Sequence, residues 1–209
     1  MQKDFAGDGL RIRSVRRPFD TLARAFHWAT VLMVLAMFAS AWLHARAHGE
    51  AFKAILLQAH RSLGVTIWVI TVLRLAWRLT NAKLPPFPIA MTKIHRAFVQ
   101  ASEYCLYGLL LSQPATGLGD ALFRGREFAL FLWRIPQLVA ADPALRTSFY
   151  FAHQLGAWLL GVLVAGHAAA ALVHHFILRD DVLKCMAPMI TQRPKPELLS
   201  GGAIQNQHS

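Results

Sequence analysis

Four long runs of apolar residues follow one another along the chain, separated by polar or proline-containing stretches. Each run holds at least 20 residues, with at most one Asp, Glu, Lys or Arg among them. A helix needs roughly 20 mostly apolar residues to cross a bilayer. The pattern therefore predicts four membrane-spanning helices, at about 26–44, 54–76, 97–118 and 149–175.

The stretches between the runs explain where the helices should end. Residues 80–94 contain three prolines, which stop a helix because proline lacks the backbone donor. The longest link, 119–147, has an apolar centre at 128–140 that suits the membrane interface or the space over the helix ends. We therefore expect an all-α membrane protein built as a four-transmembrane-helix bundle. Its expected parts are a basic segment at 1–17, a membrane domain at 18–188 and a polar, disordered tail at 189–209.

Composition and charge agree with a membrane protein. The 209 residues are 55% hydrophobic and only 16% charged, with 22 Lys and Arg against 11 Asp and Glu, a net charge of +11. Fifteen of the 22 basic residues fall in the N-terminal segment, the second link and the C-terminal segment. Because cytoplasmic loops carry the excess of Lys and Arg, both termini are predicted to be cytoplasmic. This arrangement favours contact with anionic lipids and argues against a nucleic-acid partner.

Several of the ten histidines lie inside the apolar runs, where an ionisable residue is costly and indicates function. His153 and His167 are fourteen residues apart, which is about 21 Å along a helix and within about 40° of the same face. His60 should lie at the depth of His153, near the outer side. His27 should lie at the depth of His167, near the cytoplasmic side, although His95 is a competing partner there.

The chemistry of such pairs narrows the ligand. Two facing imidazoles without a nearby thiolate or carboxylate fit poorly with tetrahedral zinc and well with the two axial positions of a haem. Neutral histidines bonded to neighbouring backbone are the structural alternative. Arg61 lies inside the second run and could pair with a haem propionate. The sequence assigns no role to Glu103, His95, His174 or His175.

Small residues near these histidines would leave room for a large flat group. Gly64 follows His60 by one turn, Gly156 follows His153, and Gly166 with the alanines at 168–171 flanks His167. Small residues also line ordinary helix contacts in membranes, so this observation alone does not separate the two interpretations.

The motifs around these histidines resemble the bacterial cytochrome b561 family. They are Arg24-Ala-Phe-His27-Trp28, His60-Arg-Ser-Leu-Gly64, Gln113-Pro-Ala-Thr-Gly117, and the run from Gly166-His167 to His174-His175-Phe176. The resemblance covers roughly residues 18–188. It implies a four-helix bundle in the bacterial inner membrane with two haem b groups per chain, each held by two histidines. Carried over, His27 and His167 hold the inner haem iron, and His60 and His153 hold the outer one.

The same resemblance implies electron exchange with the quinone pool and leaves two functions open. Some family members oxidise superoxide at the outer face with ubiquinone as acceptor, which would make the chain an oxidoreductase. Others are redox subunits that serve a partner dehydrogenase or a soluble cytochrome. A haem-free membrane scaffold with structural histidines is a third and more distant hypothesis.

Overall fold

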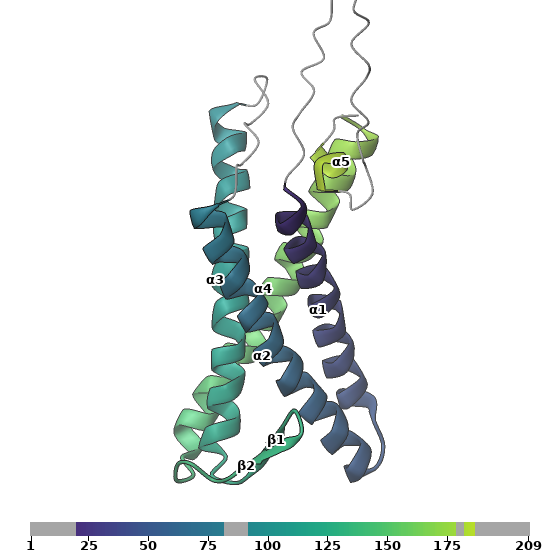
Figure 1. Ribbon diagram of the computed structural model, residues 1–209. Helices are drawn as coiled ribbons and strands as arrows, with labels where there is room; N and C mark the ends of the chain where they lie inside the picture. Colours follow the sequence, from purple (N-terminus) through teal and green to yellow (C-terminus); the bar gives the residue numbers. More distant parts are fainter. Residues whose placement is uncertain (1–19, 82–91, 179–181, 187–209) are drawn as a thin grey trace, which may run out of the picture.

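The computed structural model describes residues 20–81, 92–178 and 182–186, and most of them lie in four long helices (Figure 1). These helices are α1 (Thr21–Arg46), α2 (Glu50–Thr80), α3 (Lys93–Phe123) and α4 (Pro143–Phe176). A short helix, α5 (Val182–Met186), follows α4. The predicted spans all lie within the four long helices. The segments predicted at 1–17 and 189–209 lie outside the described residues.

The all-α prediction missed a small sheet in the link between α3 and α4. It contains an antiparallel hairpin of β1 (Phe128–Leu130) and β2 (Trp133–Ile135), in which Ala129 faces Arg134. This is the apolar stretch expected at the interface or over the helix ends. The chain is therefore mostly helical with one small two-stranded sheet.

Side-chain caps fix where three of the long helices begin. The Asp20 carboxylate accepts a hydrogen bond from the Ala23 amide at 2.7 Å, and Thr92 caps α3 in the same way. Asp142 accepts from two amides at the start of α4, where Pro143 occupies the first turn. Such residues satisfy amide groups that have no partner within the helix. The helix starts are thus encoded locally.

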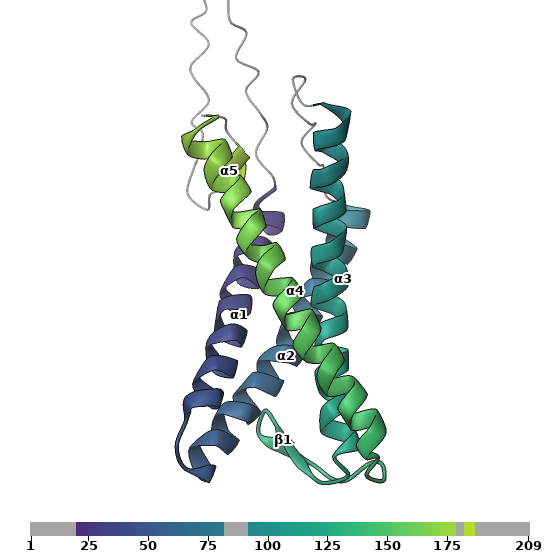
Figure 2. The same cartoon turned by 180° about the vertical axis from the view of Figure 1, so that it is seen from behind.

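The four long helices run lengthwise, with α1 beside α2 and α3 beside α4 (Figures 1 and 2). The hairpin lies at one end of the molecule, and α5 lies at the other end with the start of α1. The indole nitrogen of Trp28 donates to the Met186 carbonyl at 2.7 Å and joins α1 to α5. Both ends of the described chain therefore lie on the same side of the bundle.

A buried apolar layer joins all four helices near the middle of the bundle. It contains one residue from each helix, namely Val34, Ile67, Leu110 and Leu160. Leu160 is seven residues from His153 and seven from His167, which places this layer between the two depths of the histidines. Elsewhere most large apolar side chains are exposed, as expected for helices surrounded by lipid rather than water.

Three of the helices, α1, α2 and α4, are long and apolar enough to cross a membrane. The helix α3 is as long as α2 at 31 residues, but it is not one of the three candidates found among the described residues. It carries polar side chains along its length, including Glu103, Gln113 and Thr116, and all three contact neighbouring helices. The fold is that of a helical membrane bundle.

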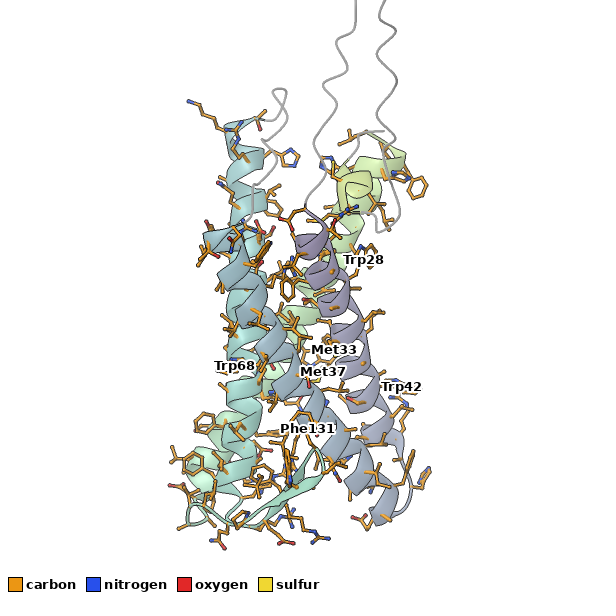
Figure 3. All side chains as sticks on the ribbon, in the orientation of Figure 1. Trp28, Met33, Met37, Trp42, Trp68 and Phe131 are labelled. Atoms are coloured by element: carbon orange, nitrogen blue, oxygen red, sulfur yellow. The ribbon has the colours of Figure 1, made fainter. Side chains whose placement is uncertain are left out.

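The hairpin is fastened to α2 on both sides of His60. The Phe131 amide donates to Ser62 Oγ at 2.7 Å, and its carbonyl accepts from the side-chain amide of Gln58. Phe131 has a φ of 51°, a left-handed conformation that is uncommon for a residue other than glycine. Figure 3 shows Phe131 at this end of the bundle, between the hairpin and the helices. The hairpin is thus held against the helix that carries His60.

Candidate haem sites

Four histidines from three helices form two facing pairs. His60 of α2 and His153 of α4 form the hairpin-end pair, with ring centroids 6.1 Å apart. His27 of α1 and His167 of α4 form the α5-end pair, with ring centroids 6.5 Å apart. His27, the partner expected for His167, is the one the structure brings beside it.

The competing partner, His95, lies elsewhere. Its ring centroid is 5.6 Å from that of His174, so these two residues form a third facing pair at the α5 end. The neighbouring His175 has a buried Nδ1 without a hydrogen-bond partner among the described residues. His95 was expected only as a competing partner of His167, and its pairing with His174 across α3 and α4 was not anticipated.

The spacing within the two main pairs suits a metal between the rings. A metal–imidazole bond of about 2 Å, with the ring centroid about 1 Å further, puts two opposed ligands about 6 Å apart between centroids. The observed separations are 6.1 and 6.5 Å. Within the described part of the chain, no cluster of three or more His, Cys, Asp or Glu side chains could hold a metal. The donor sets are thus pairs of imidazoles, as axial haem ligation requires.

Hydroxyl groups hold both rings of the hairpin-end pair. The Nδ1 atom of His60 lies 2.9 Å from Ser40 Oγ on α1. The Nδ1 atom of His153 lies 3.2 Å from Thr116 Oγ1 and 3.1 Å from the Gln113 carbonyl, both on α3. Each histidine is therefore oriented from a neighbouring helix.

A guanidinium group replaces the hydroxyls at the α5-end pair. Arg74 Nη2 lies 3.3 Å from His27 Nδ1, and the same guanidinium lies 5.3 Å from the ring centroid of Tyr107. The guanidinium carbon of Arg78 also lies near Tyr107, 5.8 Å from its ring centroid. Arg78 forms an ion pair with Glu103. Glu103, to which the sequence assigned no role, is thus the partner of an arginine. Arg74 is thus the arginine in contact with His27, while Arg78 is paired with a carboxylate.

Small and flexible side chains leave room next to the rings. A Cβ atom at Gly117 would lie 3.1 Å from His153 Cε1, and one at Gly64 would lie 3.7 Å from Met37 Cε. A Cβ at Gly166, beside His167, would meet nothing within 4 Å. Figure 3 shows Met37 between α1 and α2, towards the interior of the bundle. Unbranched methionine adapts its shape readily, so the space beside Gly64 can accept a flat ligand.

Gly156 has a different role from the one expected. Its missing side chain accommodates the buried Gln113, since a Cβ atom there would collide with the Gln113 amide. Gln113, Thr116 and Gly117 therefore all pack around His153 and its helix. The motif from Gln113 to Gly117 was visible in the sequence, but its connection to His153 depends on how α3 and α4 meet.

Arg61 lies at the hairpin end, next to His60 in α2. Its guanidinium carbon is 5.3 Å from the ring centroid of Phe128 in the hairpin. Other arginines at this end are paired with carboxylates, since Arg124 contacts Asp120 at 2.7 Å and Arg134 contacts Glu127 at 2.9 Å. Arg146 also reaches Asp120, at 3.4 Å. The positive charge of these three arginines is therefore partly compensated.

Facing imidazoles at two depths of an apolar helical bundle are typical of membrane cytochromes of the b type. Comparison with known sequences gives the particular family, because the family model for prokaryotic cytochrome b561 matches residues 18–189. The chain belongs to this family. It is therefore a bacterial membrane electron-transfer protein, and its family implies haem b.

Individual relatives agree with this assignment. Cytochrome b561 homolog 2 of Escherichia coli (strain K12) is 29% identical over 170 residues, covering 80% of this chain and 90% of the relative. Cytochrome b561 homolog 1 of the same organism is 25% identical over 165 residues, covering 78% and 92%. The probable superoxide oxidase CybB of Yersinia pestis is 24% identical over 174 residues, covering 83% and 98%.

Proposed function

We propose that this chain crosses the bacterial inner membrane four times, holds two haem b groups and passes electrons between its outer face and the quinone pool. The observation that carries the proposal is the pair of facing histidines at each end of one bundle, with ring centroids 6.1 and 6.5 Å apart. Haem would be the one-electron carrier. The protein would supply the axial ligands, the apolar surroundings and the charges that tune it.

The residues divide the tasks as follows in this proposal. His60 and His153 hold iron at the hairpin end, and His27 and His167 hold iron at the α5 end. Arg61 and Arg74, each beside one pair, are suited to the propionates because a guanidinium binds a carboxylate through two donors. The apolar layer around Leu160 keeps water out of the space between the two sites.

The proposed reaction is oxidation of superoxide with quinone as acceptor. Two superoxide ions would each lose one electron to give two molecules of oxygen, and the quinone would take both electrons and two protons to become quinol. The similarity to a protein named probable superoxide oxidase supports this choice over other donors.

Haem counting tests the ligand assignment directly. The purified protein should contain two haems per chain and give the sharp reduced-minus-oxidised α band of six-coordinate b haem. His60→Ala or His153→Ala should remove the haem at the hairpin end, and His27→Ala or His167→Ala the one at the α5 end. Two full haems in all four variants would contradict the assignment, and a haem-free wild type would support the scaffold hypothesis.

A second experiment tests the reaction. Superoxide is generated beside the detergent-solubilised protein, and quinol formation is followed, with the variant lacking all four histidines as the haem-free control. Rates equal to that control would rule out superoxide oxidation. A protein that copurifies in a fixed ratio from native membranes would favour the alternative of a redox subunit.

A further inference from the structure

Two hydroxyl side chains contact the hairpin-end histidines in the same way. Ser40 Oγ donates to the Met37 carbonyl at 2.8 Å, and Thr116 Oγ1 donates to the Gln113 carbonyl at 2.9 Å. Each acceptor carbonyl is three residues earlier in the same helix. The same two oxygens lie 2.9 and 3.2 Å from Nδ1 of His60 and His153.

This geometry favours one of the two neutral tautomers of each ring. A hydroxyl has one hydrogen, and each of these two hydroxyls has a backbone carbonyl within 2.9 Å to receive it. With the hydrogen on that carbonyl, the hydroxyl oxygen accepts from Nδ1, which is then the donor. The Gln113 carbonyl, 3.1 Å from His153 Nδ1, can likewise only accept. A neutral imidazole has one ring proton, which leaves the Nε2 lone pair of both histidines free to bind iron.

We propose that Ser40 and Thr116 are positioning residues that fix this tautomer and lower the midpoint potential at the hairpin end. The inference rests on the proposed function, because it takes His60 and His153 as iron ligands. An acceptor on the second ring nitrogen makes the ligand more basic and orients its ring. A more basic ligand stabilises ferric iron over ferrous iron, which lowers the potential.

The α5-end pair lacks the hydroxyl groups that contact the hairpin-end pair, and an arginine lies beside it instead. The atom 3.3 Å from His27 Nδ1 belongs to Arg74, and a guanidinium cannot accept a hydrogen bond. When Nε2 of His27 binds iron, Nδ1 carries the proton, so Arg74 acts on this site through its charge and not as a hydrogen-bond partner. No ring nitrogen of His167 has a hydrogen-bond partner among the residues described. A nearby positive charge also favours ferrous iron over ferric iron. The α5-end site should therefore have the higher potential, and electrons entering at the hairpin end should move downhill towards the α5 end.

Potentiometric titration of the two-haem protein tests this inference. Ser40→Ala and Thr116→Val should each raise the potential of the lower-potential haem and leave the other unchanged, and the double variant should raise it further. The same changes should speed loss of that haem to apomyoglobin about 10–100-fold. Ser40→Thr and Thr116→Ser keep the hydroxyl and should restore wild-type behaviour. Titrating His27→Ala, which should retain only the hairpin-end haem, identifies which component belongs to that end.

Matched controls come from hydroxyls that bond a backbone carbonyl but no histidine. Ser102 donates to the Val99 carbonyl at 2.8 Å, and Thr66 donates to the Ser62 carbonyl at 3.0 Å. Ser102→Ala and Thr66→Val should leave both potentials unchanged. Unchanged potentials in the Ser40 and Thr116 variants, or a shift confined to the higher-potential haem, would overturn the inference. A wild type without two haems would instead overturn the proposed function.

Discussion

At the scale of single residues, Gly119 marks a close contact between α3 and α4. A Cβ atom there would lie 2.5 Å from the ring of Phe149, which stacks on Phe123 with centroids 5.5 Å apart. Glycine at such a position lets two membrane helices approach closely. The contact lies at the hairpin end, in the two helices that carry Thr116 and His153, so it contributes to their spacing.

Gly119→Ala should destabilise the protein because the stacked ring has to move. Overpacking of this kind costs about 1–3 kcal/mol. We expect a lower midpoint in thermal unfolding followed in detergent. Gly108→Ala is the matched control, since a Cβ atom at Gly108 meets nothing within 4 Å. Equal midpoints for the two variants would contradict the packing argument.

At the scale of elements, an ion pair joins the end of α2 to α3. Arg78 and Glu103 are both largely shielded, with side-chain exposures of 22% and 32%. Removing one partner leaves the other charge in a poorly solvated position, whereas removing both does not. The pair therefore joins α2 to α3, and neither residue can be replaced alone without leaving a poorly solvated charge.

Glu103→Gln should lower the free energy of unfolding by roughly 1–3 kcal/mol, because Arg78 loses its charged partner. The double variant Arg78→Met with Glu103→Gln should lose less than the sum of the losses of Arg78→Met and Glu103→Gln alone. Chemical unfolding of all three variants measures this difference. Strictly additive losses would mean that the two groups do not interact.

The hairpin is a second element held by few contacts, so its stability should depend on Ser62. Ser62→Ala removes the acceptor of the Phe131 amide, at a cost of about 1 kcal/mol, which corresponds to roughly fivefold faster opening. Hydrogen exchange at 128–135 should increase by that factor. Ser112→Ala, which changes an exposed hydroxyl on α3, should leave exchange in the hairpin unchanged. An unchanged hairpin in Ser62→Ala would show that Gln58 and Phe128 hold it without help.

At the scale of the whole molecule, the distribution of Lys and Arg predicts the orientation. The start of α1 and α5 lie at one end of the bundle, and the hairpin lies at the other. The excess of basic residues in the terminal segments and in the second link should keep that first end in the cytoplasm. The hairpin and the His60–His153 pair would then face outwards.

Reporter fusions measure this orientation. Green fluorescent protein fused after Ser209 should fluoresce, because it folds in the cytoplasm, and alkaline phosphatase at the same place should be inactive. Alkaline phosphatase fused after Gln137 should be active. The reverse result would place the hairpin end in the cytoplasm and exclude a superoxide reaction at the outer face.

The sequence by itself determined the helices and the faces that carry the histidines. Long apolar runs, the prolines after Thr80 and caps such as Asp142 act within a few residues of chain, so they can be read without the fold. The fourteen-residue spacing of His153 and His167 is also local, because it depends only on the pitch of one helix.

Only the tertiary structure decided which side chains meet across helices. It placed His27 rather than His95 beside His167, and it brought Ser40 and Thr116 to the rings of the hairpin-end pair. It also turned the apolar stretch after Phe128 into a hairpin. These contacts depend on the rotation and crossing of separate helices, which packing over the whole bundle sets and which no local pattern of residues encodes.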